Sequence, residues 1–113
     1  MSSPIIGVKP YETVENVVRL MSKHNISQVP VIAGNKVVGS VTEKTLVRKS
    51  FEYEDLLSKK VMEIMDEPFP IINEEENIEV VKFLLEEHPA VIVQNKEGKP
   101  IGIITRSDLF KIK

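Results

Sequence analysis

The stretch Gly102–Leu109, GIITRSDL, has a near copy earlier in the chain, Gly39–Leu46, GSVTEKTL. Both begin with glycine, place an aliphatic residue and a threonine at its third and fourth positions, and end with leucine. An internal repeat of this kind is the sequence signature of a fold built from duplicated units. Within the shared frame, the residue before the leucine is Asp108 in one copy and Thr45 in the other.

The repeat extends outward over almost the whole chain. MSSPIIGVKPYETVENVVRLM aligns with MDEPFPIINEEENIEVVKFLL, so that Met1 falls on Met65. Each copy predicts an extended piece after a proline and a helix that starts near Thr13 or Asn77, because both are good N-caps. A buried strand, a turn and a second strand then predict an antiparallel hairpin. A closing helix is expected to begin at Thr42 in the first copy and at Thr105 in the second.

The predicted fold class is therefore α/β (α+β), with two β-α-β-β-α repeats. A repeat of about fifty residues cannot bury enough apolar surface alone, so we expect the two to pack sheet to sheet with pseudo-twofold symmetry. The expected domains are a first repeat over 1–50, a connecting helix over 51–65 and a second repeat over 66–113. The first copy has no counterpart of the lead-in VMEIM. Either the chain is trimmed at its N-terminus, as we expect, or the first copy lacks this lead-in.

Composition excludes several classes of function. The 113 residues contain no cysteine, which excludes disulfides, thiol chemistry and cysteine-ligated metals. The formal net charge is −2 with mixed signs, which argues against broad attachment to nucleic acid. The absence of a signal peptide and of a membrane-spanning run predicts a soluble, cytoplasmic chain. The clusters Lys44/Arg48/Lys49 and Lys59/Lys60 fit either local anion sites or solvated helix faces.

Catalysis by the chain itself has little support. Its histidines are His24 and His88, each near the end of a predicted helix, and no Ser-His-Asp or paired-carboxylate pattern is readable. We therefore expect that the chain is not an enzyme and that it has neither catalytic residues nor a metal site.

The phrase TRSD, residues 105–108, has two compatible interpretations. An aspartate can accept hydrogen bonds from both hydroxyls of a vicinal diol such as ribose, and a helix start favours anions. A threonine followed three residues later by an acidic residue also resembles a capping box. In the first copy, Thr45 can still cap a helix but offers no charge and cannot clamp both ribose hydroxyls.

These motifs resemble tandem cystathionine-β-synthase (CBS) domains, known as a Bateman module. The residues that carry the resemblance are the β-α-β-β-α repeat, VMEIM, ISQVPVI with NKVVGSVTEKTL, and GKPIGIITRSDL. These motifs are similar to those of CBS pairs in archaeal transcriptional regulators, and also to the C-terminal part of bacterial cystathionine β-synthases. The resemblance implies a sensor that binds AMP, ADP, ATP or S-adenosylmethionine between its repeats and acts on an attached or partner domain. It also implies a homodimer.

The resemblance further implies where the ligand lies. In CBS pairs the Asp-containing phrase of one repeat faces the segment before the buried strand of the other. The implied roles are ribose binding by Asp108, ribose or phosphate binding by Thr105 and Ser107, and phosphate binding by Arg106. The implied adenine contacts and apolar lining are Ile26, Ser27, Gln28, Ile6 and Val17. By residue type alone, Ile26 also fits plain core and Arg106 a solvated helix start.

A second, pseudo-symmetric site is doubtful. It would pair Thr42 and Thr45 with Pro89 and Ala90 of the segment HPAV, which is shorter than its counterpart and carries a proline without a backbone donor. We expect one strong nucleoside site, centred on Asp108. The alternative function is a dimerisation or protein-interaction module that binds no ligand.

Overall fold

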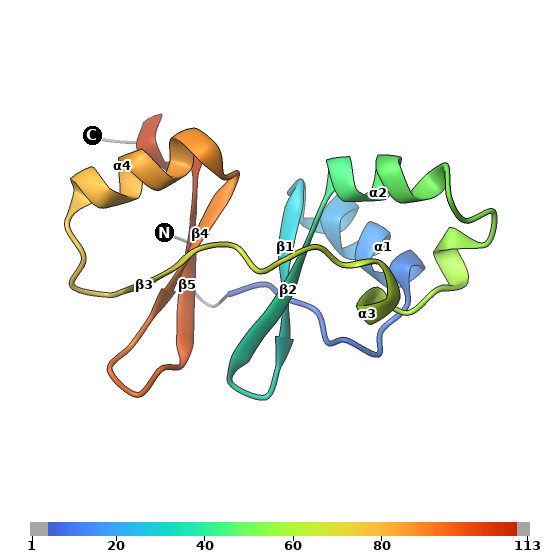
Figure 1. Cartoon of the computed structure of the whole chain (residues 1–113), viewed down its shortest axis with the longest axis horizontal. Helices are drawn as coiled ribbons and strands as arrows, with labels where there is room; N and C mark the ends of the chain where they lie inside the picture. The colour runs from blue at the N-terminus through green and yellow to red at the C-terminus, as the bar shows by residue number, and fades with distance from the viewer. Residues whose placement is uncertain (1–4, 111–113) are drawn as a thin grey trace. The chain divides into compact units, whose positions relative to one another are not determined.

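The computed structural model describes residues 5–110. These residues form two compact units, one made of Gly7–Pro68 and the other of residues 5–6 with 69–110 (Figure 1). We call them the first-repeat unit and the second-repeat unit, and each is described by itself.

The first-repeat unit is built around an antiparallel hairpin, as predicted. An isolated parallel bridge between Val8 and Val31 adds the first extended piece to this hairpin. The order is therefore β-α-β-β-α, with the first strand reduced to a single bridge. The main elements are α1 (Val14–His24), β1 (Gln28–Ala33), β2 (Lys36–Thr42) and α2 (Glu43–Ser50).

Polar caps set both ends of α1. The Thr13 Oγ1 atom accepts a hydrogen bond from the Asn16 N–H over 3.2 Å, as the N-cap prediction requires. Asn25 ends the helix in the left-handed conformation, with φ 53°, which asparagine adopts more readily than most residues. The chain then turns back, and the Ile26 N–H donates to the Met21 carbonyl over 3.0 Å.

The core of the first-repeat unit consists mainly of valines. α1 turns Val14 and Val17 toward the hairpin, and both side chains are completely buried. Each fully buried aliphatic side chain of this size contributes about 1.5–3 kcal/mol relative to an exposed one. The other fully buried valines of this core are Val29, Val31, Val41 and Val61.

The connecting segment differs from the prediction of a single helix over 51–65. The structure has a short 3₁₀ helix, η1 (Leu56–Ser58), and a short α-helix, α3 (Val61–Ile64). Between them Lys59 and Lys60 are extended.

Backbone hydrogen bonds to the start of α1 explain this break. The Val14 N–H donates to the Lys59 carbonyl over 2.9 Å, and the Val61 N–H donates to the Glu12 carbonyl over 2.8 Å. Bonds to a distant part of the chain thus replace the bonds of a continuous helix, because tertiary context overrides local helical preference.

The second-repeat unit holds a sheet with strand order β3-β4-β5. β3 runs parallel to β4, and β4 runs antiparallel to β5 (Figure 1). The closing helix expected from Thr105 is a 3₁₀ helix over its described residues. The elements are β3 (Ile71–Asn73), α4 (Ile78–Glu87), β4 (Ala90–Gln94), β5 (Pro100–Thr105) and η2 (Arg106–Phe110).

The core of the second-repeat unit lies between α4 and its sheet. The predicted N-cap is confirmed, because Asn77 Oδ1 accepts from the Val80 N–H over 3.1 Å. α4 buries Val81 and Leu85 against strand residues. Leu109 of η2 packs against the same core, which fixes the TRSD phrase at the end of β5. The buried strand residues of this cluster are Ile72, Val91 and Val93.

Candidate ligand-binding site

Asp108 lies at the junction of β5 and η2 and is bonded to the end of its own strand. Its Oδ2 atom accepts from the Thr105 N–H over 2.8 Å and lies 3.4 Å from the Thr105 hydroxyl. The Thr105 hydroxyl also lies 3.0 Å from that of Ser107. The structure thus has one of the two bonds of a capping box, the one that the carboxylate accepts.

The capping bond leaves part of the Asp108 carboxylate free. Within residues 5–110, Oδ1 of Asp108 has no hydrogen-bond partner, and no cation pairs with this side chain. The residue is half-buried. A carboxylate oxygen that is held in position and has free lone pairs can accept hydrogen bonds from a hydroxyl group of a ligand.

Arg106 is hydrogen-bonded to the end of α4 and, within residues 5–110, forms no ion pair with this carboxylate. Its Nε donates to the Leu85 carbonyl over 2.7 Å and its NH2 group to the Glu86 carbonyl over 3.4 Å. These are carbonyls of the last turn of α4, where a positive charge is favourable. The guanidinium therefore caps a helix in this structure, and a phosphate would have to compete with these bonds.

The predicted residues of the first repeat lie at the turn between α1 and β1. Ile26 is half-buried and packs against the valine core, whereas Ser27 is exposed. The Ser27 carbonyl already accepts from the Glu43 N–H over 3.0 Å, and its hydroxyl donates to Gln28 Oε1 over 2.9 Å. Val17 is completely buried inside its own core, so it presents no open surface to a ligand.

The other predicted site residues are half-buried or completely buried. Ile6 and Pro89 are half-buried, and Ala90 is completely buried in β4, opposite Thr105 of β5. Thr42 and Thr45 form a full capping box at the start of α2, and Thr45 is completely buried.

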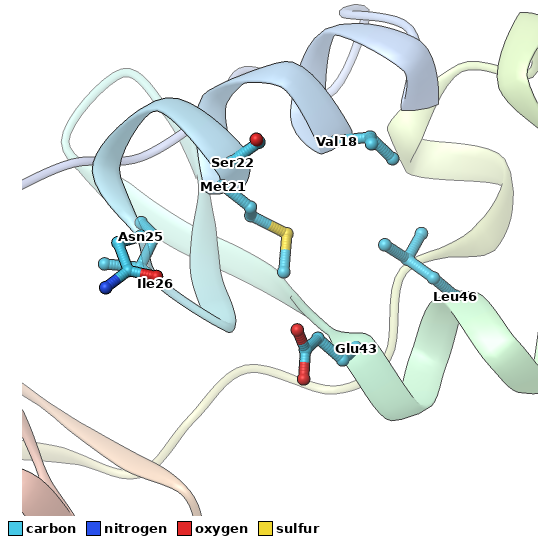
Figure 2. A pocket seen from close by; sticks show the side chains of 7 residues that line it. All are labelled: Val18, Met21, Ser22, Asn25, Ile26, Glu43 and Leu46. Atoms are coloured by element: carbon cyan, nitrogen blue, oxygen red, sulfur yellow. The ribbon is translucent and has the colours of Figure 1, made fainter.

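A cavity of about 350 Å³ lies between α1 and α2. Figure 2 shows Val18 and Met21 of α1 and Leu46 of α2 directed into it, with the Glu43 carboxylate at its rim. Ile26, which was predicted as a site residue, also lines the cavity. Ser22 and Asn25, which were not predicted, line it as well. Val18 shares the helical spacing of the core residues but is 40% exposed, because it faces this cavity instead.

The described residues contain neither a cluster of metal-ligating side chains nor a membrane-spanning helix. Over 5–110, no three acidic or histidine side chains come close enough together to hold a metal ion. No helix in the same range has the length and apolar content needed to cross a bilayer.

The family model for the CBS domain matches residues 1–52 and 61–113. The chain belongs to the CBS domain family. It holds a pair of CBS domains, and each carries one copy of the repeated phrase, Gly39–Leu46 or Gly102–Leu109.

Known CBS proteins resemble the chain over nearly its full length. The inosine-5'-monophosphate dehydrogenase of Korarchaeum cryptofilum is 32% identical over 109 residues, which are 94% of this chain and 22% of that enzyme. The chain thus spans about a fifth of the length of that curated relative. A solved structure of CBSX2 in complex with AMP has a TM-score of 0.81 and 28% identity, over 96% of this chain and 86% of the other.

A third similarity concerns the fold alone. The CBS domain protein PAE2072 from Pyrobaculum aerophilum, complexed with AMP, has a TM-score of 0.86 at 20% identity. The match covers 100% of this chain and 88% of that one.

Two features of this CBS pair cannot be predicted from the sequence. The first is the commitment of Arg106 to the end of α4, for which the sequence carries no signal. The second is a carboxylate, Asp66, that contacts Thr45 Oγ1 over 2.7 Å. Asp66 follows the VMEIM lead-in and lies outside the repeated phrase, so no comparison of the two phrases could have found it.

Proposed function

We propose that this CBS pair is a regulatory module that binds an adenosine-containing ligand and has no catalytic role. The ribose hydroxyls of the ligand hydrogen-bond to the Asp108 carboxylate, with Thr105 and Ser107 beside it. The observation that carries the proposal is the geometry of Asp108. Its Oδ2 is fixed by the Thr105 N–H, while Oδ1 has no partner among the described residues. The AMP complex of CBSX2, at 28% identity, supports AMP as the first ligand to test.

The hydrogen bond from the Thr105 N–H holds the Asp108 carboxylate in place before a ligand arrives, which favours ligand binding. A side chain that is already bonded to its own backbone loses little conformational freedom when a ligand arrives. A hydrogen bond between a hydroxyl and an ionised carboxylate is also stronger than one between neutral groups. A fixed carboxylate at Asp108 therefore supports the proposal that it binds a sugar diol.

The remaining ligand contacts follow from the family resemblance. We propose that Ile26 packs against the adenine, that backbone groups around Ser27 and Gln28 bond to its edge, and that Ile6 contributes apolar contact. We exclude Val17, because it is completely buried in its own core. We also exclude Arg106 as a phosphate ligand, because it caps α4.

Ligand binding in this proposal regulates another domain. A ligand can shift a conformational equilibrium only by its difference in affinity for the two states, typically about 1–3 kcal/mol. The chain matches only 22% of the length of the Korarchaeum enzyme, which is consistent with CBS pairs acting beside other domains. A DNA-binding regulator is one such partner that the resemblance implies.

Calorimetry with matched variants tests the proposal. AMP, ADP, ATP and S-adenosylmethionine are titrated into the wild-type chain and into Asp108→Asn, which keeps an oxygen acceptor for the Thr105 N–H but removes the charge. We expect one or more of these ligands to bind and Asp108→Asn to weaken that binding about tenfold or more, since hydrogen bonds to charged groups are worth about 1.5–3 kcal/mol. Glu97→Gln, at an exposed turn, is the control that keeps wild-type affinity. No heat with any of the four compounds, or equal affinity in Asp108→Asn, contradicts the proposal.

A second candidate function is homodimerisation without a ligand. The observation that favours it is the exposure of apolar side chains around α1 and α2, including Val18, Val47 and Phe51, the last 86% exposed. The occupant proposed for the cavity between these helices is a second copy of the chain. Light scattering should then show a dimer that Val18→Lys converts to a monomer, while Phe83→Ser on α4 leaves it intact. A wild-type monomer at high concentration removes this candidate.

A further inference from the structure

The two copies of the repeated phrase place corresponding atoms at the end of their strands. In the second repeat, the Thr105 N–H donates to Asp108 Oδ2 over 2.8 Å. In the first repeat, the Thr42 N–H donates to Thr45 Oγ1 over 3.0 Å. The hydroxyl oxygen of Thr45 therefore takes the place that Oδ2 of Asp108 takes in the other copy.

In the first repeat a carboxylate of the chain itself contacts this oxygen. The Thr45 hydroxyl donates to Asp66 Oδ2 over 2.7 Å. Because Thr45 has one hydroxyl proton, the Thr42 hydroxyl must be the donor in the 3.0 Å contact between the two threonines. Thr42 and Thr45 thus form a chain of hydrogen bonds that ends on Asp66, and Thr45 is completely buried at its centre.

Asp66 is held in this position from two sides. Its N–H donates to the Ser40 carbonyl over 2.9 Å, and its carbonyl accepts from the Ser40 N–H over 3.0 Å, so its backbone is paired with β2. Its other carboxylate oxygen, Oδ1, is paired with the guanidinium of Arg48. Both oxygens of Asp66 therefore have partners, whereas Oδ1 of Asp108 has none among residues 5–110.

We propose that the first repeat is self-occupied, because the hydroxyl protons of Thr42 and Thr45 in its strand-end phrase are already donated within the chain, to Thr45 and to Asp66. The inference rests on the proposed function of Asp108 and extends it, because it gives the chain one ligand site instead of two. Arg48, which could otherwise serve as a phosphate contact, is committed to the internal carboxylate. Thr45, which stands where the second repeat has Asp108, is then part of a hydrogen-bond network that is complete without a ligand.

The network also determines what a restored aspartate would do. Thr45→Asp recreates the residue of the second repeat but places its carboxylate against that of Asp66. Two carboxylates at hydrogen-bond distance repel each other. The substitution therefore destabilises the first-repeat unit and does not open a second ligand site.

A double-mutant cycle tests the network without any ligand. Thr45→Val, Asp66→Ala and the double variant are compared by their midpoints of urea unfolding, with Thr13→Ala combined with Asp66→Ala as the control pair. We expect Thr45→Val to lower the midpoint in the wild-type background and to lower it distinctly less in the Asp66→Ala background, because the partner is already gone. The control pair is expected to be additive. An additive Thr45–Asp66 cycle overturns the inference even if AMP binds at Asp108.

Stoichiometry provides the second measurement. Titration with AMP should give one equivalent per chain in the wild type, in Asp66→Ala and in Thr45→Asp. A second equivalent of AMP bound by the wild type or by Thr45→Asp overturns self-occupation. If the wild type binds two equivalents and Asp66→Ala binds one, Asp66 is a ligand contact. A wild-type chain that binds no AMP, ADP, ATP or S-adenosylmethionine ends the proposed function instead, and the coupling between Thr45 and Asp66 would still stand.

Discussion

Arg106 donates from Nε to the carbonyl oxygen of Leu85 over 2.7 Å and thereby ties the start of η2 to the end of α4. This arginine stands within the TRSD phrase, between Thr105 and Ser107 and two positions before Asp108. The bond connects the carboxylate-bearing junction to the helix that covers the same sheet. A phosphate near this phrase would have to compete with the α4 carbonyls for the guanidinium.

Replacing Arg106 should lower stability more than ligand affinity. Arg106→Met keeps much of the apolar stem but removes the donors to two carbonyls at a helix end. We expect the free energy of unfolding in urea to fall by about 1–2 kcal/mol. AMP affinity should change less than about threefold, the equivalent of about 0.7 kcal/mol. Lys82→Met, on the exposed face of α4, is the matched control with little effect on either quantity. Unchanged stability with lost affinity would show that Arg106 is a ligand contact.

The same bond predicts the order of nucleotide affinities. With Arg106 committed to α4, added phosphate groups have no cation within the TRSD phrase to pair with. We therefore expect ATP to bind no more tightly than AMP when both are measured by calorimetry at about 0.15 M salt, where exposed charges are screened beyond about 8 Å. ATP binding that is about tenfold tighter, and that Arg106→Met abolishes, would contradict this prediction.

Asp108 should have separable roles in stability and in binding. Asp108→Asn retains an oxygen that can accept from the Thr105 N–H, whereas Asp108→Ala does not. Loss of a cap typically costs about 1 kcal/mol. Thermal or urea unfolding should therefore show wild-type-like stability for Asp108→Asn and a loss of about 1 kcal/mol for Asp108→Ala, although both lose ligand affinity. Equal destabilisation by the two variants would mean that the charge, and not the cap, stabilises this junction.

Gly39, the first residue of the repeated phrase, should not tolerate a side chain. A Cβ atom there would clash with Met65 Sδ and lie 3.0 Å from the Asp66 carbonyl oxygen, because the segment after α3 pairs with β2 at this point. Overpacking of this kind costs about 1–3 kcal/mol, so Gly39→Ala should lower the unfolding free energy by that amount.

A second substitution identifies the cause of that loss. Met65→Ala should recover part of the stability of Gly39→Ala, since it removes the clashing side chain but not the carbonyl. Gly34→Asn, at a left-handed turn with open space around the Cβ position, is a control that should be well tolerated. Equal effects of Gly39→Ala and Gly34→Asn would contradict the packing explanation.

Local rules made a large part of this fold predictable from sequence. The caps Thr13 and Asn77 were found because a polar residue before a helical apolar pattern satisfies free backbone N–H groups wherever it occurs. The two hairpins were found because alternation and turn residues act over a few positions. Asp108 was selected because the repeat allowed one copy to be compared with the other.

Sequence periodicity did not predict how the connecting segment folds. Leu56, Leu57, Met62 and Met65 stand at helical spacing. Lys59 and Lys60 are nevertheless extended, because backbone groups of Glu12 and Val14 bond to this segment. Val18 shows the same limit: Val14, Val17, Val18 and Met21 recur at helical spacing, which predicts a shared buried face, whereas Val18 is 40% exposed and faces a cavity. A pattern reports which residues share a face of a helix, but not which neighbour covers that face.

The sequence by itself determined the duplicated β-α-β-β-α order, the helix starts and the position of the single aspartate in the repeated phrase. These features depend on interactions between residues a few positions apart, which a linear pattern records. Only the tertiary structure decided that Arg106 caps α4 and that Asp66 completes the network of Thr45. Their partners lie about twenty residues away in the chain and meet only because the strands and helices pack, and hydrogen-bond partners at that separation leave no periodic trace in the sequence.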